Sequence, residues 1–131
     1  MAEDSHKPEE HTVRFGEDRI LRITHAPGSR VRAADVRGIL AQARELFDGK
    51  ALVLVDIRSV GSVDREARAV LGSDEFAERT LAQALLVETL VSRAIGNFML
   101  GLNRTPYPTR MFTSEDKALA WLKSFSSPHP G

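Results

Sequence analysis

The sequence predicts an α/β protein: a two-layer sandwich whose sheet is mixed but mostly parallel. A continuous apolar run at residues 51–57 ends in a short loop that leads into a helical pattern. This is how a buried parallel strand passes to its crossover helix. Apolar stripes with helical spacing alternate with short apolar runs along the rest of the chain. Two short β-type runs precede them, which adds an antiparallel start to the sheet.

Composition excludes several classes of protein. The 131 residues are enough for one domain with its own core, and the absence of cysteine excludes a disulfide framework or a thiolate metal site. Eighteen basic and eighteen acidic side chains cancel, so no overall field attracts nucleic acid or anionic lipid. The first residues lack the pattern of a secretory signal, and the most apolar window contains Glu88 and Arg93. We therefore expect a cytoplasmic protein without a membrane span.

The domain is predicted to occupy residues 12–125. Residues 1–11 and 126–131 are rich in charge or proline and nearly free of apolar side chains, which is typical of disordered tails.

The first half of the domain is predicted to be a hairpin, a helix and a buried strand. The runs Thr12–Phe15 and Arg19–Thr24 are separated by three residues and form the hairpin. A helical stripe from Val36 to Phe47 stops before Gly49, which favours a left-handed residue after the helix. Ala51–Ile57 has no polar alternation, so this strand is expected to be covered on both faces.

Two short helices and a second buried strand follow. Asp64 is placed to begin a helix, which Gly72 interrupts. A second short helix contains Phe76. The apolar run Ala82–Val87 is the next buried strand.

The last part of the domain is predicted to be a helix, a strand and a final helix. The helix covers Val91–Leu102, and Gly96 within it favours close packing against a neighbour. The prolines that follow cannot continue a helix. Arg110–Phe112 is a short strand, and Thr113 or Ser114 caps the final helix. The buried face of that helix is predicted to consist of Ala118, Leu119, Trp121, Leu122 and Phe125. The predicted order is ββαβαβαβα, joined by right-handed crossovers.

This order, with an acidic residue ending the central strand, resembles the STAS fold of anti-sigma factor antagonists. More specifically, the segments VLVDIRSVGSVDREAR, VSRAIGNFMLGLN and PTRMFTSEDKALAWL resemble a family of small, largely uncharacterised bacterial proteins grouped with STAS and SEC14-like domains. The resemblance implies a regulatory protein that acts by contact with a protein partner.

In the anti-sigma factor antagonists, a partner kinase phosphorylates a serine at the start of the helix after the central strand. The resemblance aligns Asp56 with the family's strand-ending aspartate and Asp64 with its helix-leading one. Glu66 then stands at the phosphoserine position. Its carboxylate mimics part of the charge of a phosphate, and the acceptor hydroxyl is missing. Ser59 and Ser62 lie nearby but do not match the motif.

The run VLVDIR is also similar to the phospho-acceptor strand of two-component receiver domains. That family has an acidic pair at the end of its first strand and a lysine at the end of its last. The corresponding strand ends here are ITHA and MFTS, which disfavours this interpretation.

The predicted site is the carboxyl edge of the sheet, where parallel strands deliver their following loops. The predicted partner-binding residues are Asp56, Arg58, Ser59, Ser62, Asp64, Arg65, Glu66, Ser92 and Arg93. Helix N-terminal amides at residues 64–67 and 91–94 could in addition bind an anionic ligand. The alternative is purely structural: Asp64 caps a helix, Asp56 accepts loop amides and the arginines pair locally.

Three functions remain open from the sequence. The leading hypothesis is a non-enzymatic regulatory or scaffold module that binds a protein partner through the loop 58–66 and the helix behind it. The second is a small-molecule or lipid binder with an apolar pocket between the sheet and the helix Val91–Leu102, as the SEC14-like grouping implies. The third is an enzyme, but no histidine accompanies the carboxylates and no nucleotide loop or metal spacing occurs. We therefore predict no catalytic residue, cofactor or metal, and leave a homodimer open.

Overall fold

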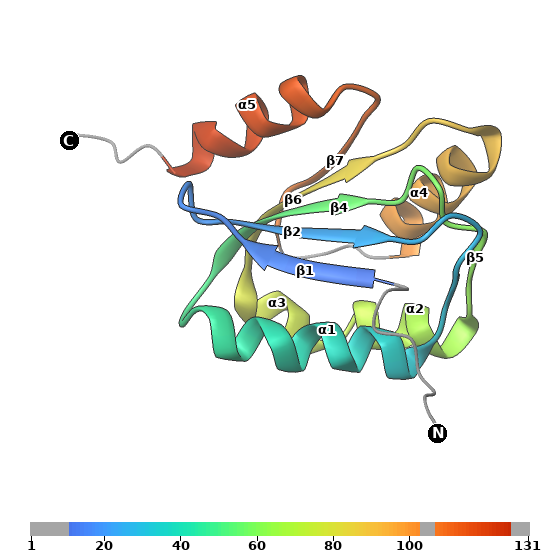
Figure 1. The fold of residues 1–131 in the computed structure, drawn as a ribbon, viewed down its shortest axis with the longest axis horizontal. Helices are drawn as coiled ribbons and strands as arrows, with labels where there is room; N and C mark the ends of the chain where they lie inside the picture. The colour runs from blue at the N-terminus through green and yellow to red at the C-terminus, as the bar shows by residue number, and fades with distance from the viewer. Residues whose placement is uncertain (1–10, 103–106, 127–131) are drawn as a thin grey trace.

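Five strands form the central sheet in the order β1-β2-β4-β6-β7 (Figure 1). This computed structural model describes residues 11–102 and 107–126. The strands are β1 (His11–Phe15), β2 (Ile20–His25), β4 (Ala51–Asp56), β6 (Thr80–Leu86) and β7 (Thr109–Phe112). The hairpin pair β1 and β2 is antiparallel, and the other three pairings are parallel. The prediction of a mixed, mostly parallel sheet is confirmed.

Helices cover both faces of this sheet. Those within the described ranges are α1 (Ala33–Leu46), α2 (Arg65–Leu71), α3 (Asp74–Arg79), α4 (Leu90–Leu102) and α5 (Glu115–Ser126). Figure 1 shows α1, α2 and α3 on one face and α5 alone on the other. The predicted α/β class is therefore confirmed, but α5 adds a third layer to the predicted two, because the inner strands are apolar on both faces.

The strand β4 contributes to two separate cores. Val53 and Val55 belong to the larger core, which also contains residues of α1 and α4. Leu52 and Leu54 point the other way, into a smaller core beneath α5. Alternate side chains of a strand point to opposite faces, so both faces of β4 are covered, as its unbroken apolar run predicts.

Two short strands were not predicted. β3 (Arg30–Val31) and β5 (Ser62–Val63) pair in parallel and form a second sheet. Two residues are too few to produce an alternating pattern.

The element boundaries differ from the predictions at both ends of the domain. The predicted tails lie outside the described residues except His11, which begins β1, and Ser126, which ends α5. The prediction that Phe125 belongs to the buried face of the last helix is wrong. It is 36% exposed and contacts Trp121 edge to face instead.

Gly96 brings α4 close to the sheet, as the sequence predicts. A Cβ atom at this position would overlap the sulfur of Met111 and lie 3.2 Å from Cγ1 of Val87. A side chain at this position would therefore have to displace Met111 and press on Val87.

We expect Gly96→Ala to lower the free energy of unfolding by about 1–3 kcal/mol, because the added methyl group overpacks the core. Gly38→Ala is the matched control, since Gly38 lies in α1 and a Cβ atom there would meet no neighbouring group within 4 Å. It should stabilise the protein by roughly 0.5–1 kcal/mol through helix propensity. Urea denaturation measures both. Equal stability of the two variants would contradict the packing role.

Candidate functional site

The loop that follows β4 is fixed against the segment before α1. The amide of Gly28 donates to the carbonyl of Ser59 (2.7 Å), and the amide of Gly61 donates to the carbonyl of Ser29 (2.8 Å). A Cβ atom on Gly61 would lie 3.0 Å from the carbonyl oxygen of Gly28. Together with the β3–β5 pairing, these bonds hold the loop in one position at the carboxyl edge of the sheet.

Asp56 and Arg58 form a closed pair at the end of β4. The carboxylate accepts hydrogen bonds from the Arg58 backbone amide (3.0 Å), Nε (3.0 Å) and Nη2 (2.7 Å). Burial alone would raise the pKa of Asp56, but these hydrogen bonds outweigh it and lower the pKa below 3.8. The structural interpretation of Asp56 is confirmed. Arg58 Nη2 also lies 4.0 Å from a carboxylate oxygen of Glu115, a neighbour that the sequence did not indicate.

Asp64 stands at the N-cap position of α2, but its side chain does not cap the helix. Its carboxylate accepts a hydrogen bond from Nε of Arg30 at 3.0 Å. Arg30 belongs to β3, and the prediction missed it because the two residues are 34 positions apart in sequence.

The exposed residues among the predicted site residues of the loop after β4 and the start of α2 are Ser59, Ser62, Arg65 and Glu66, which we call the docking rim. Within the described residues, neither Arg65 nor Glu66 has an ion pair. Both lie in the first turn of α2, so the rim presents an unpaired positive and an unpaired negative charge side by side. Arg93, on α4, is also exposed.

Ser92 does not belong to this exposed surface, in contrast to the prediction. It is 0% exposed. Its hydroxyl oxygen accepts hydrogen bonds from the amides of Glu88 (2.8 Å) and Thr89 (2.9 Å). The Ser92 amide donates to Oγ1 of Thr89 (3.0 Å), which completes a reciprocal cap at the start of α4. Ser92 is therefore a structural residue.

The start of α4 is partly occupied by its own cap. The Ser92 amide donates to Oγ1 of Thr89, and the Arg93 amide donates to the Thr89 carbonyl. At α2 an anion would meet the carboxylates of Asp64 and Glu66, which disfavours an anion site there.

Two carboxylates at this edge are already engaged by neighbouring side chains. Asp56 and Asp64 are each paired with a different arginine. Across residues 11–102 and 107–126, no three histidine, cysteine or acidic side chains are placed to hold a metal ion. No helix in these ranges is long and apolar enough to cross a membrane.

An apolar helix face lies beside the docking rim. Leu90 is 86% exposed, and Val91 and Phe98 are also exposed. With Ala94, they fall within an arc of about 100° on α4. The guanidinium of Arg68, in α2, lies 4.1 Å from the centre of the Phe98 ring, so α2 and α4 are in contact.

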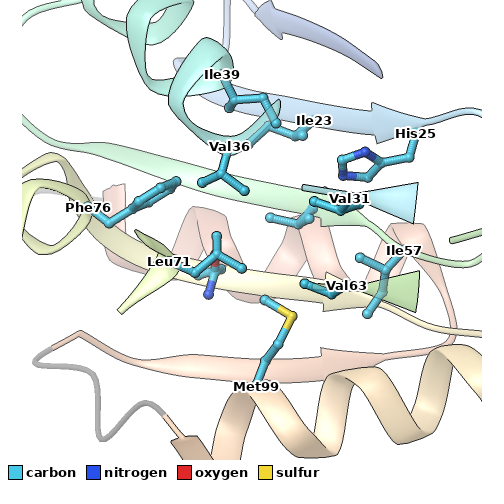
Figure 2. Close-up of a pocket in the computed structure, with 12 residues that line it drawn as sticks. Ile23, His25, Val31, Val36, Ile39, Ile57, Val63, Leu71, Phe76 and Met99 are labelled. Carbon is cyan, nitrogen blue, oxygen red and sulfur yellow. The ribbon is translucent and has the colours of Figure 1, made fainter. Parts of the chain in front are cut away.

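A cavity of about 40 Å³ lies between the central sheet and the helices α1, α2, α3 and α4 (Figure 2). Its walls come from β2, β4, β6 and the surrounding helices and short strands. The lining residues are Ile23, His25, Val31, Val36, Ile39, Val55, Ile57, Val63, Leu71, Phe76, Gln83 and Met99.

Comparison with known proteins gives a family and a fold. A family model described as "Domain of unknown function (DUF7793)" matches residues 15–126. An uncharacterized protein from Shewanella loihica PV-4, of the DUF3478 family and with a SpoIIAA-like fold, is 15% identical. It covers 91% of this chain and 98% of its own, with a TM-score of 0.65.

Two further structures are similar. The anti-sigma factor antagonist SpoIIAA in its unphosphorylated form is 15% identical and covers 86% of this chain and 97% of its own, with a TM-score of 0.52. A protein of unknown function from Arthrobacter sp. FB24 is 36% identical over 91% of this chain and 96% of its own, with a TM-score of 0.33. No curated protein matches the sequence. The predicted STAS-like fold is confirmed, and the SEC14-like grouping stays a prediction.

We expect Arg58→Gln to raise the pKa of Asp56, because burial then acts without the guanidinium hydrogen bonds. In the wild type the lowered pKa contributes stability above pH 3.8, and this contribution is lost as the pH falls through the folded-state pKa. In the variant this contribution shrinks, because the folded-state pKa of Asp56 moves toward its ordinary value of 3.8. Carboxyl ¹³C shifts followed against pH measure the pKa, with Arg65→Gln as the exposed control. An unchanged Asp56 pKa in Arg58→Gln would refute the assignment.

Proposed function

The chain belongs to the DUF7793 family, and we propose that it is a non-enzymatic regulatory or scaffold module that binds a protein partner. The contact surface is the docking rim together with α2 and the exposed face of α4. The SpoIIAA-like fold supports a regulatory role of this kind. We further propose that this module is a single domain over residues 12–125 and works in the cytoplasm, where a chain without cysteine is at no disadvantage.

The exposed apolar face of α4 carries this proposal. Contiguous apolar side chains that remain exposed beside charged ones are typical of protein interfaces, where an apolar centre is surrounded by a polar rim. Here Leu90 and Phe98 supply apolar area, and Arg65 and Glu66 supply charges that are not already paired within the described residues. The pairs Asp56–Arg58 and Asp64–Arg30 keep this surface in shape but have little free charge to offer a partner.

Glu66 gives the proposed contact a fixed charge. A glutamate has no hydroxyl to phosphorylate. Partner binding at this position is therefore not switched by phosphorylation, as it is at the phosphoserine of the anti-sigma factor antagonists. We therefore propose a constitutive contact.

We expect the double variant R65E/E66R to lose capture of the partner from an extract of the native cells. The variant keeps the net charge but reverses both charges that face the partner, and like charges placed across an interface are strongly unfavourable. Quantitative mass spectrometry of the captured proteins measures the loss, which should be at least tenfold. The melting temperature should stay within a degree or two, because both side chains are exposed.

The matched control is D48K/K50E, which reverses two exposed charges in the turn between α1 and β4, at the other end of the sheet. It should capture the partner as well as the wild type does. If R65E/E66R also retains capture, the proposed surface is wrong. Sedimentation velocity over a concentration series then shows whether a second copy, rather than another protein, covers the face of α4.

Small-molecule binding is the second candidate function, and the cavity favours it. About 40 Å³ accommodates only a few water-sized groups, at roughly 10–15 Å³ each. An acyl chain is much larger. The size of the cavity therefore argues for a small ligand and against a lipid.

We expect native mass spectrometry of freshly purified protein to show no lipid adduct, because the cavity cannot admit one without separating α2 from the sheet. Delipidation followed by a second spectrum is the control for weakly attached detergent or lipid. A stoichiometric lipid that survives gel filtration would contradict this expectation and restore the lipid-binding hypothesis.

A further inference from the structure

The cavity has one polar wall group whose hydrogen-bonding capacity is unused. Gln83, on β6, is 5% exposed and lines the cavity. Within the part of the chain that the structure describes, no group hydrogen-bonds its side-chain amide. The amide faces the cavity, so a group placed in the cavity can reach its donor and acceptor atoms.

Water is the competing partner for this amide. A buried water is typically held by two to four polar groups. Around this cavity the polar side chains are Gln83 and His25, and the remaining walls are aliphatic, aromatic or thioether. Figure 2 shows His25 at one end of the ring of side chains and Phe76 at the other. A molecule with an apolar body and a single polar group matches these walls better than a water cluster does.

The cavity also selects for a ligand without charge. No lysine, arginine, aspartate or glutamate lines it. Burial, and then the nearby His11, lower the pKa of His25 to about 4, so its ring is neutral at pH 7. An ion placed here would lose its hydration and gain no counter-charge.

We propose that this cavity is a binding site for a small neutral molecule that carries a hydrogen-bond donor and acceptor side by side, such as a primary amide with a short alkyl chain. The Gln83 amide presents one carbonyl oxygen and one NH₂ group, so it pairs with both groups of such a molecule. The apolar part of the ligand then contacts Val36, Ile39 and Phe76. Met99 has a flexible thioether side chain that adapts to the size of the ligand.

The site differs from the docking surface and can be tested separately. Val31 and Val63, from the β3–β5 pair, line the cavity and lie close in sequence to the docking rim and its supporting segment. Arg65 and Glu66 do not line it. Loss of partner capture in R65E/E66R therefore has no bearing on ligand binding, and loss of ligand binding has none on capture.

Propionamide is the probe, and 2-butanone is its control. The two molecules have the same number of non-hydrogen atoms, but 2-butanone replaces the NH₂ group with a methyl group and can only accept a hydrogen bond. We expect propionamide to cause saturable methyl shifts at Met99, Val36 and Ile39 in ¹³C-methyl NMR spectra, with a millimolar dissociation constant. 2-Butanone should bind at least tenfold more weakly.

Gln83→Met tests the amide directly, because it removes the polar group and keeps the length of the side chain. Its affinity for propionamide should fall at least tenfold, while its melting temperature should hold or rise, since an unpaired polar group is gone. Gln42→Met, on the exposed face of α1, is the matched control and should bind propionamide as the wild type does.

Leu71→Phe provides a second test if Gln83→Met does not fold. It fills the cavity from α2 while leaving Gln83 in place, and it should also abolish the shifts. The proposal is overturned if the wild type shows no saturable shift at the solubility limit of propionamide. It is equally overturned if Gln83→Met or Leu71→Phe binds as tightly as the wild type, or if 2-butanone binds as tightly as propionamide.

Discussion

The burial of β4 on both faces is the constraint on which the rest of the structure depends. Val53 and Val55 need cover on one side, and Leu52 and Leu54 need cover on the other. Hydrogen bonding to β2 and β6 leaves no edge of this strand open. The helices are thereby distributed over both faces, and Asp56 is delivered to the edge of the sheet with little freedom in its position. The loop that carries part of the docking rim begins at this fixed residue.

The same edge separates structural charges from available ones. Asp56 with Arg58, and Asp64 with Arg30, use their charges to shape the loop. Arg65 and Glu66 follow directly in the chain but lie on the exposed side of α2. Because these ion pairs already fix the loop, its backbone does not need to become ordered on partner binding. Little of the binding free energy is then lost to conformational entropy.

Sequence patterns predicted the long elements because each one has its own apolar period. The double coverage of β4 follows from an unbroken apolar run, and the close approach of α4 follows from Gly96. Pairings between distant residues have no such local signal: Arg30 reaches Asp64 across 34 positions, and β3 and β5 are too short to show alternation. Ser92 was misplaced because a capping serine and an exposed one look alike in sequence. The cavity depends on side chains from most of the elements, so no local pattern in the sequence identified its lining residues.

The unequal layering of the sheet makes one of its faces dependent on a single helix. The face formed by Ile20, Leu54 and Leu86 is covered by α5 alone, the last helix in the described chain. A state in which α5 is undocked leaves this apolar strip in contact with water, and such a strip is vulnerable to self-association and suited to chaperone binding.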